Sequence, residues 1–243
     1  MKTSALIIGA SSAIAQCLIR QLLDEAIVEQ VIAVSRGKNE DLTTEYQESL
    51  LWIESEYSAA DIKEVCNQLA GYRGSFAYVF IANGVLHNAD ISPEKRLEQI
   101  SEEGLQENFY INAIVPLLWI AALVDLVKGE LDCRVAVFSA RVGSIEDNRA
   151  GGWYGYRASK AALNMLLKSA SIEYARRAKN VSLLAFHPGT TDTKLSRPFQ
   201  ASVPENNLFT PEFVASRLLH LLSNRNAESE FAFLDWQGRT IPW

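Results

Sequence analysis

The sequence is poor in cysteine, and the three cysteines that it has lie far apart. Cys17, Cys66 and Cys133 are odd in number and form no CxxC spacing. This pattern argues against a disulfide framework and against a zinc site, and it suits a reduced compartment. We therefore expect no structural metal.

An excess of basic residues and a long apolar N-terminal segment are also missing. With 23 Lys and Arg against 29 Asp and Glu, the formal net charge of the 243 residues is −6. A nucleic-acid-binding domain normally carries a basic face, so that class is disfavoured. The N-terminal apolar run is interrupted by Gly9 and by serines, and it is too short for a membrane span and a poor signal peptide. We expect a cytoplasmic protein without a membrane span.

Short apolar runs recur along the chain, each followed by a segment with helical spacing. The runs are continuous rather than alternating, as in strands that are buried on both faces. They cover residues 4–8, 31–35, 50–54, 77–82, 134–139, 181–186 and 231–234, with helical periodicity over 14–24, 59–69 and 156–177. This alternation predicts an α/β fold, a single doubly wound Rossmann-type domain over residues 1–243. It has about seven parallel strands with helices on both faces.

The turn after the first predicted strand is poor in glycine for a nucleotide-binding loop. It reads GASSAIA, with Ala13 and Ala15 where the usual second and third glycines would stand. In open α/β sheets this turn approaches the ligand phosphate, and the next helix offers free backbone N–H groups. The alternative is a plain strand–helix turn, but the first position in the chain favours a nucleotide. The expected cofactor contacts here are Gly9, Ser11, Ser12 and Ile14.

The end of the second predicted strand lacks the acid that usually holds the ribose diol of NAD. The stretch VIAVSRG places Ser35 and Arg36 there, with Lys38 close behind. An acid would repel a 2′-phosphate, whereas a serine and a guanidinium would bind one. An exposed loop arginine is the plainer alternative. We expect the cofactor to be NADP (NADPH).

Tyr156 and Lys160 lie four residues apart in GGWYGYRASKAALN, on one face of a predicted helix. Most such pairs are surface decoration. Carbonyl reduction, however, needs a proton donor as hydride arrives, and a cation one turn away would stabilise a phenolate and lower the pKa of the tyrosine. Trp153 and Tyr154, just before this pair, are expected to form the wall of a substrate pocket or to be structural.

In their order along the chain, these motifs resemble the short-chain dehydrogenase/reductase family, and within it the branch named after the cell–cell signalling C-factor. The matching stretches are GASSAIA, IANG at 81–84, NFYINAIVPL, FSARVGS after the fifth predicted strand, YRASK and HPGTTDT at 187–193. The resemblance implies that Tyr156 is the acid–base group and that Lys160 tunes it and binds the nicotinamide ribose. It also implies that Asn112 supports a proton relay.

Further cofactor contacts are implied by the resemblance alone. Glu56 and Tyr57 match positions beside the adenine, and Asn83 and Gly84 match a stretch on the adenosine side. The turn that meets the nicotinamide carboxamide and the pyrophosphate is matched by Pro188, Gly189, Thr191 and Thr193.

The catalytic serine of the family is displaced in this chain. The family pattern Ser-Ser-x-x-Gly is replaced by Ser139-Ala140-Arg141-Val142-Gly143, so Ala140 occupies the position of the serine that bonds the substrate oxygen. We assign the role to Ser139, which lies nearest the nicotinamide end of the strand. Ser144, or no serine at all, is the alternative.

The substrate is expected to bind in the longest irregular stretch, residues 188–210, where Leu195, Phe199 and Leu208 are apolar candidates. The predicted function is an NADP-dependent oxidoreductase that interconverts a carbonyl and an alcohol on a small or medium apolar substrate. The alternative is a nucleotide-binding sensor or signalling protein with little turnover. A predicted helix over residues 101–126 is apolar on nearly all sides, which favours a homodimer or homotetramer over a monomer with a deeply buried helix.

Overall fold

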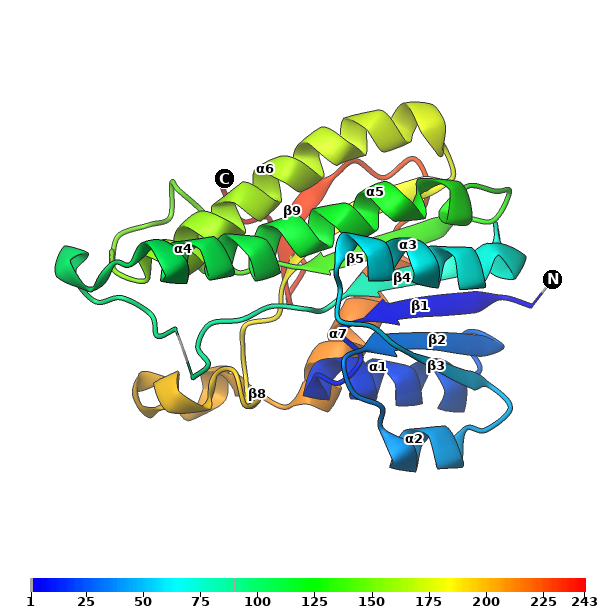
Figure 1. Cartoon of the computed structure of the whole chain (residues 1–243), viewed down its shortest axis with the longest axis horizontal. Coiled ribbons are helices and arrows are strands. Elements are labelled where there is room, and N and C mark those ends of the chain that lie inside the picture. Colours follow the sequence, from blue (N-terminus) through cyan, green and yellow to red (C-terminus); the bar gives the residue numbers. More distant parts are fainter. Residues whose placement is uncertain (1, 90) are drawn as a thin grey trace.

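A seven-stranded parallel sheet forms the centre of the computed structural model, which describes residues 2–89 and 91–243 (Figure 1). The strand order is β3-β2-β1-β4-β5-β6-β9, and each neighbouring pair is parallel. The strands are β1 (Ser4–Ile8), β2 (Gln30–Ser35), β3 (Leu50–Glu54), β4 (Phe76–Ile81), β5 (Cys133–Phe138), β6 (Val181–His187) and β9 (Ala232–Asp235). All seven predicted runs became strands of this sheet, so the predicted fold class is confirmed.

Burial explains why the apolar runs are continuous. Every residue of β1, at the middle of the sheet, is buried, whereas the edge strand β3 is only partly covered and leaves Leu51 38% exposed. A strand covered by helices on both faces must be apolar on both. The chain begins in the middle of the sheet and reverses direction after β3. That reversal opens a crevice at the carboxyl ends of β1 and β4, where ligands bind in open α/β sheets.

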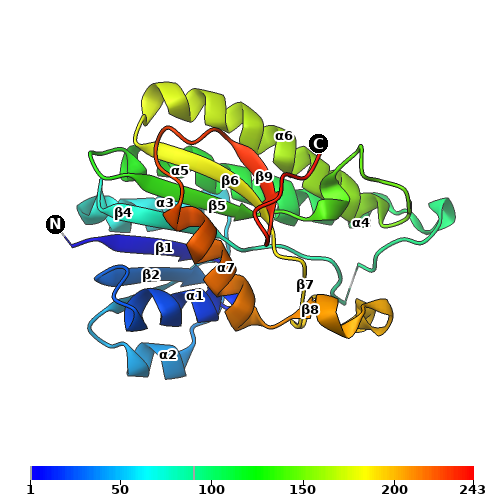
Figure 2. The ribbon, with the colours of Figure 1, turned by 180° about the vertical axis from the view of Figure 1, so that it is seen from behind.

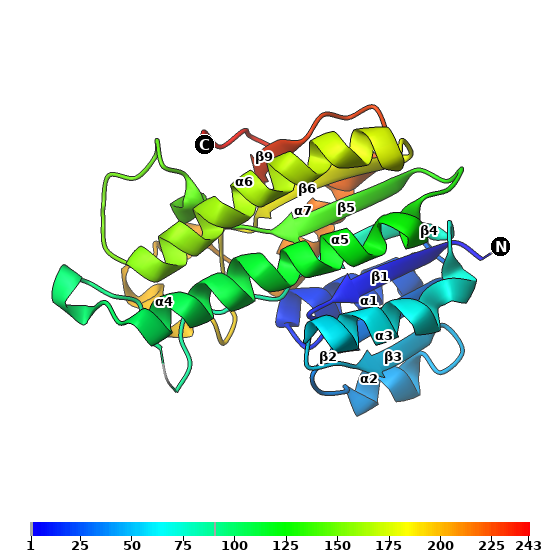
Figure 3. The ribbon, with the colours of Figure 1, turned by 45° about the horizontal axis from the view of Figure 1, so that its top comes forward.

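Helices cover both faces of the sheet. One face carries α1 (Ala13–Asp24), α2 (Glu40–Glu45) and α7 (Pro211–Ser223), of which α1 and α7 lie in the foreground of Figure 2. The other carries α3 (Ala59–Gln68), α5 (Val115–Val127) and α6 (Tyr154–Arg177), which lie side by side in Figure 3. Apolar side chains of each trio pack against one face of the strands, so the sheet separates two apolar cores.

A long apolar helix runs through the second face. It consists of α4 (Glu102–Phe109), a π-helical turn (Tyr110–Ile114) and α5, and by length and composition alone it could cross a membrane. More than half of its most apolar window (56%) is buried inside the protein, and a core helix of a soluble protein has the same properties. The π-helical turn holds Asn112, and turns of this kind are frequent at functional sites.

The segment from residue 188 to residue 210 is more regular than expected. It contains a two-stranded parallel pair, β7 (Thr190–Thr191) with β8 (Leu208–Phe209), and two 3₁₀ turns, Arg197–Ser202 and Glu205–Asn207. Further 3₁₀ turns occupy Leu69–Tyr72, Leu97–Gln99 and Arg141–Gly143. Backbone pairing between β7 and β8 closes the segment into a compact loop beside the sheet, which composition and periodicity did not reveal.

Candidate active site

A cavity of about 1220 Å³ lies at the carboxyl ends of the strands, where the sequence predicts the cofactor. It brings together segments that follow β1, β4, β5 and β6 and the first turns of α6. The predicted site residues that line it are Ser11, Ser12, Ile14, Asn83, Gly84, Ser139, Tyr156, Lys160, Pro188, Gly189, Thr191 and Thr193. Gly9, Ser35, Arg36, Glu56, Tyr57 and Asn112 are outside its lining.

Gly9 makes the tight turn that leads from β1 into α1. Its φ is +81°, and a Cβ there would lie 2.6 Å from the backbone nitrogen of Asn83. Only glycine allows the loops after β1 and β4 to approach so closely. Ser12 then caps α1, because its hydroxyl accepts a hydrogen bond from the Ala15 N–H at 3.3 Å. The exposed Ser11 and the start of α1 face the cavity, and phosphate binding by this helix N-terminus stays a prediction.

Arg36 and Ser35 differ in what they offer a 2′-phosphate. Ser35 is fully buried, and its hydroxyl donates to the Gly37 carbonyl at 2.7 Å and accepts from Trp52 Nε1 at 3.2 Å. Arg36 is exposed and makes no ion pair within the described residues, whereas Lys38 pairs with Glu40 at 3.2 Å. The structure therefore leaves Arg36 as the available cation at the end of β2.

The hydroxyl of Tyr57 links the turn at Gly9 to the end of β2. It donates to the Val34 carbonyl and accepts from the Gly9 N–H, both at 3.1 Å. The residue is buried with a φ of +66°, and burial raises its pKa to about 12. Glu56 beside it is exposed. Adenine binding by Glu56 and Tyr57 stays a prediction, while the link from Tyr57 to Gly9 was not predicted from the sequence.

Tyr156 and Lys160 lie one turn apart on α6 and are both buried. Lys160 Nζ lies 5.9 Å from the centre of the Tyr156 ring and donates to the Phe138 carbonyl at the end of β5, at 2.9 Å. A Cβ on Gly143 would lie 2.8 Å from the carbonyl carbon and the Cβ of Lys160. The glycine therefore lets the loop after β5 press directly against the helix.

Burial controls the protonation of this pair. It raises the pKa of Tyr156 to about 12 and lowers the pKa of Lys160 to about 8. The expected lowering of the Tyr156 pKa by Lys160 is not found in this structure, because withdrawal from water disfavours the phenolate and raises the pKa. At neutral pH the phenol therefore keeps its proton, which suits a proton donor for reduction.

Asn112 joins three parts of the site from the π-helical turn. Its side chain accepts from the Val85 N–H at 2.8 Å and donates to the Val85 carbonyl at 2.9 Å and to the Ser159 hydroxyl at 3.2 Å. A Cβ on Gly84 would lie 3.2 Å from Asn112 Oδ1 and 3.5 Å from Lys160 Nζ, so these groups surround the same point. Asn112 thus fixes the loop after β4 beside Lys160, and its part in a proton relay stays a prediction.

Ser139 and Ala140 face different neighbours. Ala140 packs with Tyr156 and Leu86, as its family position implies, and has no hydroxyl to offer. Ser139 lines the cavity, but its hydroxyl donates to Asn164 Oδ1 at 2.6 Å. Ser144 is buried outside the lining, where its hydroxyl accepts from the Asp147 N–H at 3.0 Å. The assignment of Ser139 as the substrate donor stays a prediction, and a substrate would have to compete with Asn164.

An aromatic wall closes the cavity beside Tyr156. Trp153 lies edge-on to the Tyr156 ring at 6.2 Å and to the Phe199 ring at 5.1 Å, and His87 packs on Phe199 at 5.5 Å. Trp153, Phe199 and Leu195 line the cavity, whereas Tyr154 and Leu208 do not. Four further lining residues, Leu86, Lys95, Arg141 and Val142, were not predicted from the sequence.

Unsatisfied polar atoms and positive charge suit this cavity to an anionic cofactor. Asn83 Oδ1 and Thr191 Oγ1 are buried without a hydrogen-bond partner in the described part of the chain, and both residues line the cavity. The lining contains Lys95, Arg141, Lys160 and Lys194 but no Asp or Glu from residues 2–89 and 91–243. His187 also lines it; burial lowers its pKa to about 4, so it is neutral at pH 7. The same ranges contain no cluster of three or more His, Cys, Asp and Glu that could hold a metal ion.

A doubly wound sheet with a glycine turn at its first helix and a Tyr–Lys pair over its carboxyl edge defines a nucleotide-dependent oxidoreductase. Residues 3–203 match the short chain dehydrogenase family, and the protein belongs to this family of NAD(P)-dependent enzymes.

Individual relatives agree with the family assignment. The chain is 29% identical, over 247 aligned positions, to 1-hydroxy-2-glutathionyl-2-methyl-3-butene dehydrogenase of Rhodococcus sp. (strain AD45), covering 99% of this chain and 100% of that protein. It is 33% identical over 147 positions to C-signal of Myxococcus xanthus, covering 60% of this chain and 83% of that one. The NADPH-bound carbonyl reductase from chicken fatty liver superposes with a TM-score of 0.84 at 23% identity, covering 99% and 94% of the two chains. The last comparison shows a shared fold.

Proposed function

We propose that the protein is an NADPH-dependent carbonyl reductase whose proton donor is Tyr156. The supporting observation is the buried phenol of Tyr156, beside Lys160 and facing a cavity of about 1220 Å³. NADPH supplies the hydride when it is bound. Tyr156 gives its proton to the substrate oxygen, and the Lys160 ammonium stabilises the phenolate that forms. Asn112 keeps the loop after β4 in place beside this pair.

The substrate class follows from the wall around Tyr156. Leu86, Val142, Trp153 and Phe199 surround the end of the cavity where Tyr156 lies. A wall of aliphatic and aromatic side chains binds an apolar body and leaves the carbonyl as the group to be oriented. We propose a ketone or aldehyde of small or medium size with an apolar, ring-bearing body. The sharp test is NADPH oxidation against a panel of such carbonyls.

The cofactor preference is proposed to depend on Arg36. Replacing Arg36 with Ala is expected to weaken NADPH binding by about tenfold to a hundredfold, because a charge-assisted contact with a phosphate is worth about 1.5–3 kcal/mol. NADH binding is expected to be unchanged. Titration of both cofactors by fluorescence measures the effect, and Lys38→Ala is the control, because Lys38 already pairs with Glu40. Equal affinity of the wild type for NADPH and NADH would contradict the proposal.

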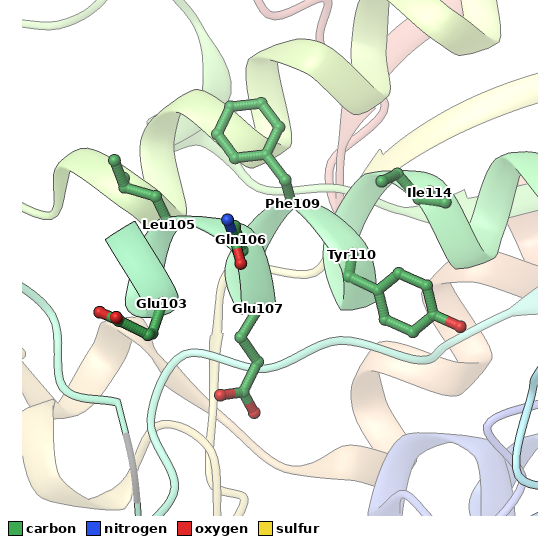
Figure 4. A pocket seen from close by; sticks show the side chains of 7 residues that line it. All are labelled: Glu103, Leu105, Gln106, Glu107, Phe109, Tyr110 and Ile114. Atoms are coloured by element: carbon green, nitrogen blue, oxygen red, sulfur yellow. The ribbon is translucent and has the colours of Figure 1, made fainter. Parts of the chain in front are cut away.

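A homodimer or homotetramer is proposed to form through α4, the π-helical turn and α6. The outer side of this surface holds the exposed apolar residues Tyr110 (44%), Ile114 (43%), Met165 (67%) and Ile172 (49%). Figure 4 shows Phe109, Tyr110 and Ile114 beside a hollow that is also lined by Glu103 and Glu107. Exposed apolar residues gathered on neighbouring helices are typical of an interface. Light scattering at micromolar concentration should give the wild type a mass of at least two chains. The substitution Ile114→Asp should lower that mass. A monomeric wild type would contradict the proposal.

A further inference from the structure

The catalytic helix α6 begins without a cap of its own. Trp153, the residue before the helix, has a left-handed backbone (φ 53°, ψ 44°) and its side chain makes no capping hydrogen bond. Gly151 and Gly152 just before it also have positive φ values, both 64°. The first N–H groups of a helix need acceptors, which normally come from a Ser, Thr, Asp or Asn at this place. For α6 the acceptor must come from elsewhere.

Glu94 supplies that acceptor from a distant segment. Its carboxylate accepts from the Gly155 N–H at 3.2 Å, and its backbone carbonyl accepts from the Trp153 N–H at 2.5 Å. The residue is 6% exposed, and no Lys, Arg or His of the described ranges forms an ion pair with it. The positive end of the helix dipole is therefore the charge that it faces.

The contact joins two sides of the cavity. Glu94 lies in the connection between β4 and α4, which supplies Leu86 and Lys95 to the cavity lining. Gly155 directly precedes Tyr156, and Trp153 lies edge-on to the Tyr156 ring. A change at Glu94 would thus move the first turn of α6 and the aromatic wall together.

Gly155 leaves the space that Glu94 needs. A Cβ at position 155 would lie 3.0 Å from both Glu94 Oε1 and Asn108 Nδ2, which is tighter than ordinary packing. Alanine stabilises a helix more than glycine does, so helix stability alone would favour alanine at position 155. The glycine at this position is explained by the close approach of the carboxylate.

We propose that Glu94 is a positioning residue for Tyr156: by capping α6 from the substrate side, it sets the height and direction of the phenol relative to the cavity. The inference rests on the proposed reduction by Tyr156. The cap requires an acceptor oxygen at position 94 rather than a negative charge alone, so Glu94→Gln should keep the geometry and Glu94→Ala should lose it.

The test compares Glu94→Ala, Glu94→Gln and Gly155→Ala with Glu98→Ala, an exposed acid in the same connection. Glu94→Ala is expected to lower kcat by about tenfold to a hundredfold, because small displacements of a catalytic group are costly. The NADPH Kd should stay within about twofold, because the phosphate loop is separate from this contact. Glu94→Gln should restore most of kcat, Gly155→Ala should lower it without lowering Tm, and Glu98→Ala should change nothing. Wild-type kcat in Glu94→Ala, or no rescue by Gln, would overturn the inference.

Hydrogen exchange separates this inference from the proposed reaction. Exchange of the amides in residues 154–157 needs no substrate, and Glu94→Ala should speed it while the middle of α6 stays protected. Unchanged exchange would overturn the cap even if the enzyme reduces carbonyls. If Glu94→Ala speeds the exchange but the wild type reduces none of the carbonyls in the panel, the capping role of Glu94 is supported and the proposed reaction is refuted. If Glu94→Ala fails to fold, the same comparison is made with Glu94→Gln and Gly155→Ala, where only Gly155→Ala should speed exchange.

Discussion

Replacing Tyr156 with Phe is expected to remove carbonyl reduction and leave the protein folded and able to bind NADPH. The ring packs against Trp153 and Ala140, and phenylalanine keeps those contacts. Only the hydroxyl, and with it the proton that the substrate oxygen needs, is lost. Loss of a general acid typically costs about 10²–10⁴ in rate. NADPH oxidation at saturating carbonyl concentration measures kcat, and NADPH fluorescence measures binding.

The neighbouring tyrosine provides the control. Tyr154 lies at the start of the same helix but outside the cavity lining, so Tyr154→Phe is expected to keep the wild-type rate. A Tyr156→Phe enzyme that retains more than about a tenth of wild-type kcat would show that another group donates the proton. A wild-type protein that binds NADPH tightly and oxidises it with none of the carbonyls would instead favour the nucleotide-sensing alternative.

Replacing Ala140 with Ser is expected to raise kcat, which is the second large effect. Ala140 packs against Tyr156 and is 8% exposed, so a hydroxyl at this position would face the proton donor. An oxyanion-type donor typically contributes a factor of about 10²–10³. We expect a smaller gain, about tenfold to a hundredfold, because Ala140 already packs against Leu86 and Tyr156 and the added hydroxyl must share that space. Steady-state kinetics on any carbonyl that the wild type accepts decides the result.

The serine variants show where the wild-type donor lies. Ser139→Ala is expected to cost kcat if the hydroxyl leaves Asn164 to meet the substrate, and to leave kcat unchanged if it keeps that 2.6 Å hydrogen bond. Ser144→Ala is the matched control, because Ser144 is buried outside the cavity lining. If Ser139→Ala and Ser144→Ala both keep the full rate and Ala140→Ser accelerates nothing, Tyr156 acts without a serine partner.

The sheet and the Tyr–Lys pair could be predicted because both depend on local spacing. Strands buried on both faces need continuous apolar residues, and all seven runs showed them. Tyr156 and Lys160 share a helix face whatever the rest of the chain does. The turn at Gly9 was equally visible, since it must follow the first strand of an α/β chain. These features need no knowledge of which distant segments meet.

The roles of Glu94, Tyr57 and Ser35 could not be predicted, because each depends on a partner far away in the sequence or on burial. Glu94 meets Gly155, and Tyr57 meets Gly9, although the partners are 61 and 48 residues apart in the sequence. Ser35 looked available beside Arg36, yet its hydroxyl is taken up by Gly37 and Trp52. The direction of the Tyr156 pKa shift was missed for the same reason: spacing reveals a neighbouring cation, but the loss of water that raises the pKa is a property of the folded cavity.

The described lining of the cavity contains no acidic side chain, although the protein as a whole is negatively charged. An incoming nicotinamide cofactor is therefore repelled at long range and attracted at short range. At long range a polyanionic cofactor approaches a protein of formal net charge −6 and is repelled. Within the last few ångströms it meets Lys95, Lys160 and Lys194, whereas the charge of Arg141 is paired with Asp147 and Asp235. At physiological ionic strength screening acts beyond about 8 Å, so added salt weakens the distant repulsion more than the attraction inside the cavity. The rate of cofactor capture should therefore rise with added salt, because the long-range repulsion is screened first.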